Sequence, residues 1–267
     1  MRKFTDSQKS SGQKKVEIKL LSQEFCIYSN PTILLSKFKG GKRAEAAQWS
    51  LEVQKMHRGI VESVRALGNF MNQTAQNKKL YLENQEITIP DEKRRWTMIY
   101  LIDNSILRNY AWLDKIAQLC RCYFEYSENG GELEVIQKCG CKEIMTEKNC
   151  NFGALLNYLA RDNKKNKTII VEALKKLNSD KSIQTLREYR NAFTHKKNFL
   201  DQTVGLDPTV KATYKDDGTV STVFNFGEYL PSINWFRVAI VNANNALVEC
   251  TEQVGSIIFP RDFKQIL

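Results

Sequence analysis

The amino-acid sequence predicts a mainly α-helical bundle with a small β-hairpin appendage. Three observations support this. Apolar residues recur every three or four positions over two long stretches, Pro and Gly number only 5 and 13 in 267 residues, and Asp217-Gly218 lies between two strand-like runs. The first pattern is typical of amphipathic helices and the last of a hairpin. With 42% hydrophobic residues the chain can bury a large core, which excludes collagen-like and disordered classes.

The first forty residues differ in composition from the rest. Residues 1–40 are predicted to be a basic N-terminal arm or short strands: either a loose arm, or an edge strand that begins near Val16 and runs through the apolar stretch around Leu20 and Phe25. The helical domain is predicted to occupy residues 41–267.

Two long helices are expected to form the centre of this domain. From Lys42 to Met71, apolar residues recur at helical spacing, and the polar residues 72–84 then interrupt the pattern. Pro90, followed by two acidic residues, indicates the start of a second helix that runs to about Phe124. Because this helix is apolar nearly all the way round, we expect it to lie in the middle of the bundle.

Shorter elements are predicted to follow. Residues 125–150 combine glycines, cysteines and mixed charges, which indicates an insertion with a short hairpin. The remaining pattern predicts further helices and one more hairpin, closed by a two-residue turn at Asp217-Gly218. Their expected ranges are 154–160, 163–177 and 179–195 for helices, about 210–226 for the hairpin, and a last helix from Pro231.

The charge balance predicts a polyanionic partner. Lys and Arg number 40 and Asp and Glu 30, giving a net charge of +10. Nucleic acid is the first expectation and an anionic membrane surface the second. No window of eighteen apolar residues and no secretory pattern is seen, so we expect no membrane span. Seven cysteines without such a signal favour reduced thiols, and hence a cytoplasmic protein.

The run from Leu186 to His195 carries the most informative chemistry. On a helix, one arc is apolar and the opposite arc holds Arg187, Asn191 and His195, with Arg190 on the border. Asn191 and His195 are four residues apart and therefore neighbours on the helix surface. A histidine can move protons near neutral pH, and arginine binds phosphate oxygens. This combination suits an RNA phosphodiester, whose own 2′-hydroxyl is the nucleophile, and requires no metal or other cofactor.

The run Arg190-Asn191, three residues, then His195 resembles the signature helix of the HEPN superfamily. The resemblance implies a helical bundle that acts as a metal-independent endoribonuclease in prokaryotic antiviral defence or toxin systems. It implies that Arg190 binds phosphate and stabilises the transition state. It also implies that Asn191 is the orienting polar residue of the motif and that His195 is the general acid and base. It also implies a homodimer in which two copies of the motif share one cleft.

Further residues are predicted to support this site. Arg187, Lys196 and Lys197 are expected to bind the substrate. Asp103 and Arg108 on the central helix resemble an acidic-to-basic pair found in some of these families. Our hypothesis is that Asp103 is buried and orients an arginine across the bundle, because a buried carboxylate requires a partner.

Alternative interpretations remain open from the sequence. The same face could bind RNA or a nucleotide without cleaving it, because fold and motif do not guarantee activity. It could also contact a protein partner such as an antitoxin or a nucleotidyltransferase. His57 is expected to be a core histidine. The cysteines near residues 139–150 are expected to be reduced thiols, with structural zinc as the alternative.

Overall fold

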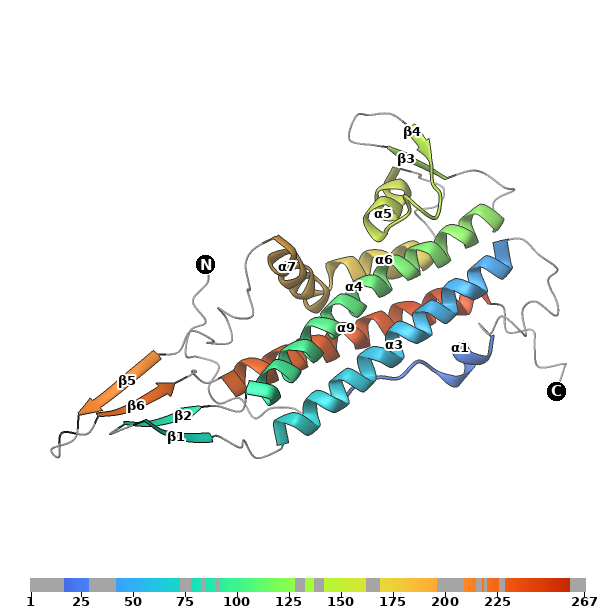
Figure 1. Ribbon diagram of the computed structural model, residues 1–267. Helices are drawn as coiled ribbons and strands as arrows, with labels where there is room; N and C mark the ends of the chain where they lie inside the picture. The colour runs from blue at the N-terminus through green and yellow to red at the C-terminus, as the bar shows by residue number, and fades with distance from the viewer. Residues whose placement is uncertain are drawn as a thin grey trace.

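The computed structural model describes residues 17–28, 42–72, 78–82, 85–89, 92–127, 133–136, 142–161, 169–195, 209–214, 218, 220–225 and 229–259. Within these ranges the protein is a mainly α-helical bundle with small β-structures attached to it (Figure 1). The predicted fold class is therefore confirmed. No helix in the described ranges combines the length and apolarity needed to cross a membrane.

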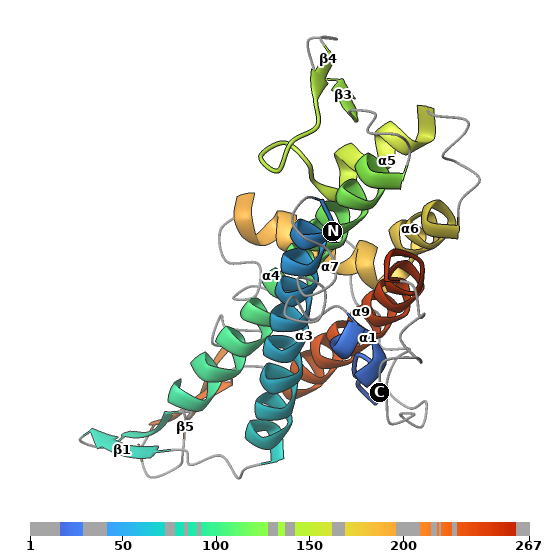
Figure 2. The same ribbon diagram turned by 90° about the vertical axis from the view of Figure 1, so that its right-hand side faces the viewer.

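Three long helices form the centre of the bundle. They are α3 (Lys42–Asn72), α4 (Glu92–Ser127) and α9 (Tyr229–Ile258). Helix α4 packs along α3 and also against α9, and the views in Figures 1 and 2 agree on this arrangement. Its fully buried side chains include Ile102, Trp112 and Ile116. The predicted central position of this helix is confirmed, because neighbours cover it on several sides.

The N-terminal part of the bundle differs from the prediction. Residues 17–22 precede a short helix, α1 (Gln23–Tyr28), so the expected strand through Phe25 is wrong. The hydroxyl of Ser22 accepts a hydrogen bond from the Phe25 N–H at 3.1 Å and thereby caps α1. The Phe25 ring packs beside Gly255 of α9, where an added Cβ would lie 2.6 Å from the ring. Packing against α9 therefore sets the conformation of this segment.

Three shorter helices cover α4 and α9. They are α5 (Phe152–Arg161), α6 (Ile169–Ser179) and α7 (Lys181–His195). Side-chain caps fix two of their starts. Asn151 accepts the Ala154 N–H at 2.9 Å, and Asp180 accepts the Ser182 and Ile183 N–H groups at 2.8 and 3.2 Å. The helices predicted in these regions are therefore present.

The β-structure is larger than expected. The predicted hairpin is present as β5 (Thr209–Tyr214) and β6 (Val220–Asn225), which pair antiparallel. It joins a second hairpin, β1 (Lys78–Leu82) and β2 (Gln85–Ile89), through a parallel β2–β6 contact. The resulting sheet, in the order β1-β2-β6-β5, lies at one end of the bundle (Figure 1).

The turn between β5 and β6 also differs from the prediction. Tyr214 pairs with Val220, which leaves five residues between the paired ends. A two-residue turn at Asp217-Gly218 cannot close this register, so that prediction is wrong. Gly218 has a φ of 79°, the left-handed conformation that longer hairpin loops place on glycine. The insertion hairpin predicted within 125–150 is confirmed as β3 (Glu134–Ile136) and β4 (Lys142–Ile144).

Candidate functional site

Helix α7 carries the predicted site and is anchored by its apolar arc. Ile183 and Leu186 are buried. The Tyr189 ring meets Trp235 and Phe236 of α9 edge-to-face, with centroids 5.4 and 4.7 Å apart. Burial, and secondarily Glu188, raises the pKa of Tyr189 to about 12. The predicted division of this helix into an apolar and a polar arc is therefore confirmed as far as Asn191.

Arg190 lies at the border of the two arcs, where α7 meets α4. Its guanidinium carbon is 4.4 Å from the centroid of the Tyr110 ring of α4, a cation–π contact. Its Nη1 donates a hydrogen bond of 3.3 Å to Oδ1 of the exposed Asn191. The arginine side chain is half-buried, so part of it still meets solvent. Tyr110 and Asn191 thus hold a cation at the molecular surface.

His195 is the last residue of α7 and follows Asn191 by about one turn. The side chain of His195 lies outside the described part of the structure. Lys196 and Lys197, predicted to bind substrate, also lie outside it.

Arg187 and Asp103 occupy different surroundings. The Nη2 of Arg187 donates to Oδ1 of Asn178 near the end of α6, at 3.0 Å, so this arginine ties α7 to α6. Asp103 is half-buried on α4, seven residues before Tyr110. Residues seven apart lie on the same side of a helix, so Asp103 is on the side of α4 that Arg190 contacts. An orienting role of Asp103 stays a prediction.

Arg108 is not brought to this site. It lies five residues after Asp103 on α4, which places it about 140° further round the helix. Its Nε donates to Oδ1 of Asn104 at 3.1 Å, and its guanidinium lies over Gly59 of α3, where an added Cβ would be 2.4 Å from Nη1. The structure thus directs Arg108 towards α3, on another side of α4 from Arg190.

Two features of the structure were not identified from the sequence. The first is the contact between Tyr110 and Arg190, because no local pattern pairs a tyrosine of the central helix with an arginine 80 residues later. The second is a buried arginine, Arg121, which is 3% exposed near the C-terminal end of α4. The signal for it is its spacing, four residues after Ala117 and three before Phe124, where the apolar repeat of the helix continues.

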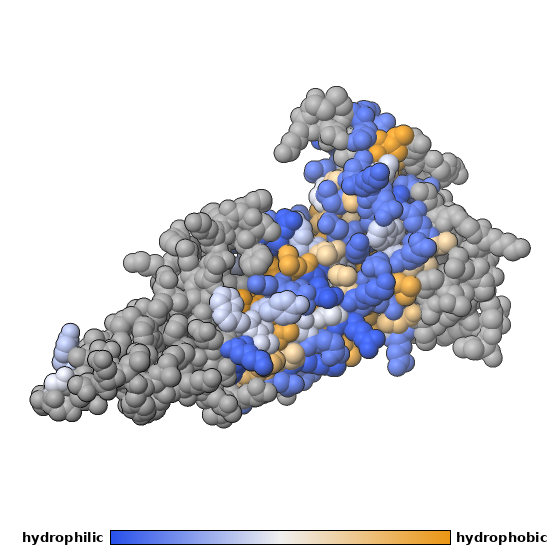
Figure 3. All heavy atoms as spheres, in the orientation of Figure 1, coloured by the Kyte–Doolittle hydropathy of each residue, from blue (hydrophilic) through white to orange (hydrophobic). Residues whose placement is uncertain are grey.

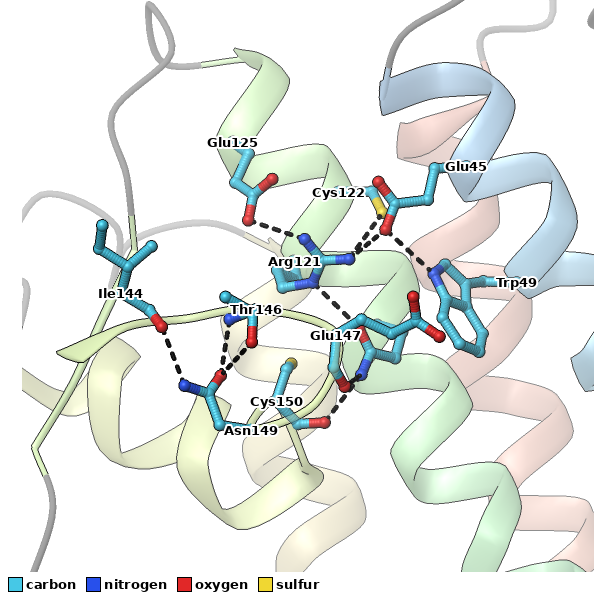
Figure 4. Close-up of polar contacts among 11 residues, drawn as sticks. Glu45, Trp49, Arg121, Cys122, Glu125, Ile144, Thr146, Glu147, Asn149 and Cys150 are labelled. Atoms are coloured by element: carbon cyan, nitrogen blue, oxygen red, sulfur yellow. Dashed lines mark hydrogen bonds and ion pairs between the residues drawn. The ribbon is translucent and has the colours of Figure 1, made fainter.

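The partners of Arg121 form a closed cluster (Figure 4). Its guanidinium bonds to Glu125 at 2.9 Å, to the Gln118 oxygen at 2.9 Å and to Glu45 of α3. Burial by itself lowers the pKa of Arg121, but Cys122 and the two carboxylates raise it above its ordinary value. The guanidinium therefore stays charged inside the protein.

The same cluster holds the loop before α5. The Gln118 amide donates to the carbonyl oxygens of Glu147 and Cys150 at 2.8 and 2.9 Å. Asp114 accepts the Phe152 N–H at 3.0 Å, at the start of α5. These contacts join α3, α4 and the loop, so we interpret the Arg121 cluster as a structural element.

His57 has the environment expected of a core histidine. It is 8% exposed, its Nε2 lies 3.2 Å from the Lys19 carbonyl oxygen, and its ring meets Trp112 edge-to-face. Burial lowers the pKa of His57. The prediction of a structural role for this residue is confirmed.

The described cysteines are free thiols, and most are buried. Burial raises the pKa of Cys150 and of Cys250 to about 12, and raises that of Cys120 well above its ordinary value. These thiols are protonated at neutral pH. Over the described ranges, no group of three His, Cys, Asp or Glu side chains is arranged to hold a metal ion. Cys139 and Cys141 lie outside those ranges.

Among the described residues, Arg190 with Tyr110 and Asn191 is thus the arrangement best suited to an anionic ligand, because it holds an arginine side chain at a partly solvent-exposed position.

In comparisons with protein-family models, curated proteins and solved structures, nothing matches the chain.

Proposed function

We propose that the protein is a metal-independent endoribonuclease whose site consists of Arg190, Asn191 and His195 at the end of α7. The observation that supports this most is the position of Arg190. Its guanidinium is stacked on Tyr110 and bonded to Asn191 while part of the side chain meets solvent. An arginine held in this way is preorganised for phosphate oxygens, because little side-chain entropy remains to be lost on binding.

The reaction uses the 2′-hydroxyl of the RNA as nucleophile. One imidazole takes the proton of this hydroxyl as its oxygen attacks the adjacent phosphorus. The bond from phosphorus to the 5′-oxygen breaks, and an imidazolium returns a proton to that oxygen. The products are a 2′,3′-cyclic phosphate and a 5′-hydroxyl. Arg190 stabilises the extra negative charge on the phosphate oxygens in the transition state.

The two proton transfers are best served by two histidines. In a homodimer with twofold symmetry, the same surface of each copy meets the other, and the two motifs come together. One His195 then acts as base and the other as acid. We propose this composite arrangement together with the activity. We also propose a role in antiviral defence or in a toxin system, with an antitoxin as a further partner.

RNA binding without cleavage is the second candidate function. The stacking of Arg190 on Tyr110 supports it equally, because this contact serves phosphate binding whether or not a bond is broken. The two candidates differ in whether His195 transfers protons.

The test is digestion of single-stranded RNA with EDTA present, followed by analysis of the product ends. We expect products that end in cyclic phosphate and 5′-hydroxyl, formed at the same rate with and without the chelator. A matched RNA with 2′-deoxyribose at the cleaved positions should bind but stay intact. Binding of both RNAs with cleavage of neither would select the binding function instead.

A further inference from the structure

Helix α4 carries an aromatic stripe that is exposed although the helix is central. It consists of Trp96, Tyr100 and Leu107, whose exposed fractions are 50%, 66% and 44%. The spacings of four and seven residues place all three on one side of the helix. This is also the side of Asp103 and of Tyr110, the residue that Arg190 covers.

The neighbours of α4 explain where the stripe begins and ends. Towards the C-terminus, Arg190 of α7 lies over Tyr110, and Asp114 bonds to the start of α5. The earlier turns of the same side face outward. In Figure 3, apolar and weakly polar side chains gather near the middle of this face, with strongly hydrophilic residues below them and to their right. The aromatic stripe therefore leads along the surface directly to Arg190.

The size of the stripe favours a small partner surface. Fully buried aromatic side chains contribute about 150–250 Å² each, so the exposed parts of these three residues amount to about 300 Å². A stable protein interface buries about 800 Å² on each partner. The stripe alone is too small for a second copy of the chain, but the exposed parts of two aromatic side chains suit stacking on bases.

The charges around the stripe favour an anionic chain over a protein. The exposed Lys93 lies one turn before Trp96, Arg190 lies at the opposite end, and the whole chain carries a net charge of +10. Asp103 lies on the same side of α4 and is half-buried, with its Oδ1 enclosed in the protein, and its negative charge repels phosphates. A nucleic-acid strand would therefore turn its bases, rather than its phosphates, towards α4.

We propose that the aromatic stripe binds bases of single-stranded RNA next to the phosphate held by Arg190. This rests on the proposed function of the α7 site. From Tyr100 to Tyr110 the helix rises about 15 Å, and from Trp96 about 21 Å, so the strand covers several nucleotides. Stacking on Trp96 and Tyr100 tolerates any base, since every base has an aromatic face. The stripe thus contributes affinity for unpaired RNA and leaves the chemical step to α7.

The test measures the affinity of the full chain for a fluorescent single-stranded RNA of about eight nucleotides. Trp96→Ala and Tyr100→Ala should each weaken binding about tenfold, corresponding to the loss of one stacked base. Trp96→Phe and Tyr100→Phe should retain most of the affinity because a ring remains. The matched control is Tyr214→Ala, which removes a 79% exposed tyrosine from β5, away from the stripe. This control should bind like the parent.

Two results would overturn the inference. One is unchanged RNA affinity in the Trp96→Ala, Tyr100→Ala double variant. The other is a lower sedimentation coefficient in that variant, which would assign the stripe to a protein interface. Cleavage at saturating RNA is measured in parallel. A parent that binds through the stripe but cuts nothing would refute the proposed nuclease alone, whereas normal binding by the double variant with active cleavage would refute the stripe alone.

Discussion

Two arginines on neighbouring helices show how the same side chain serves two purposes. Arg121 in α4 is 3% exposed, and its guanidinium is bonded to two carboxylates and an amide oxygen. Arg190 in α7 is half-buried and is held by a tyrosine ring and a neutral amide. The first has its charge compensated within the protein. For the second, both of these contacting groups are uncharged.

The surroundings of each arginine indicate its role. A buried guanidinium with carboxylate partners cannot receive an external anion without breaking existing ion pairs. A cation–π contact holds a guanidinium by its face, whereas a guanidinium binds phosphate oxygens through its edge N–H groups. We therefore assign stability to the Arg121 cluster and ligand binding to Arg190, and the following variants test that assignment.

Replacing the buried arginine should have the largest effect. Arg121→Ala leaves Glu45 and Glu125 facing each other without a cation, so we expect the free energy of unfolding to fall by about 3–5 kcal/mol. Chemical denaturation measures this. Any protein that remains folded should bind and cut RNA like the parent. A stable Arg121→Ala protein that has lost RNA binding would reverse our assignment of the two arginines.

Replacing the surface arginine should affect activity instead. Arg190→Ala should reduce the RNA cleavage rate by about 10²–10³-fold, the loss typical for one transition-state donor. The free energy of unfolding should change by less than about 1 kcal/mol. Arg65→Ala is the matched control for the loss of one exposed positive charge on α3. If both variants lose the same small factor in rate, Arg190 acts only through the net charge.

The buried histidine His57 extends the comparison to the pH dependence of stability. Burial lowers the pKa of His57 in the folded protein, so below pH 6.5 the unfolded state binds a proton that the folded state does not. Stability should therefore fall as the pH drops below about 6.5 and level off below the folded pKa. Thermal melts across this range measure the effect, and His57→Gln should flatten it. A pH dependence unchanged by this substitution would point to other groups.

An exposed ion pair should matter least. Lys19 pairs with Glu249 of α9 at the surface, with exposed fractions of 52% and 46% for the two side chains. Pairs of this kind contribute about 0–1 kcal/mol. Lys19→Ala should therefore shift the melting temperature only slightly, and less in high salt than in low salt. A large shift would show that the segment before α1 depends on this ion pair more than on its backbone contacts.

The long helices could be predicted from the sequence because their signals are local. The apolar repeat of α3 and the Pro90 start signal of α4 both depend on residues a few positions apart. The hairpin β1–β2 lacks such a signal, and β2 pairs with β6 from a distant part of the chain. Its strands therefore depend on tertiary contacts that no local pattern reports.

The candidate site shows the same limit. The spacing of Arg190, Asn191 and His195 is visible in the sequence, because all three lie on one helix. The partner of Arg190 is Tyr110 on another helix, and the partner of Arg121 is Glu45, 76 positions away. Such contacts depend on how helices pack. Arg108, expected near the site because Asp103 and Arg108 resemble an acidic-to-basic pair, instead faces α3.

The most direct test of the nuclease proposal is the single-turnover cleavage rate of His195→Ala on single-stranded RNA in the presence of EDTA. RNA binding and thermal stability are measured on the same preparation. We predict that the variant folds and binds RNA like the parent but cuts at less than about a hundredth of its rate. Cleavage by His195→Ala at the parent's rate would contradict the assignment of this histidine, and with it the proposed mechanism.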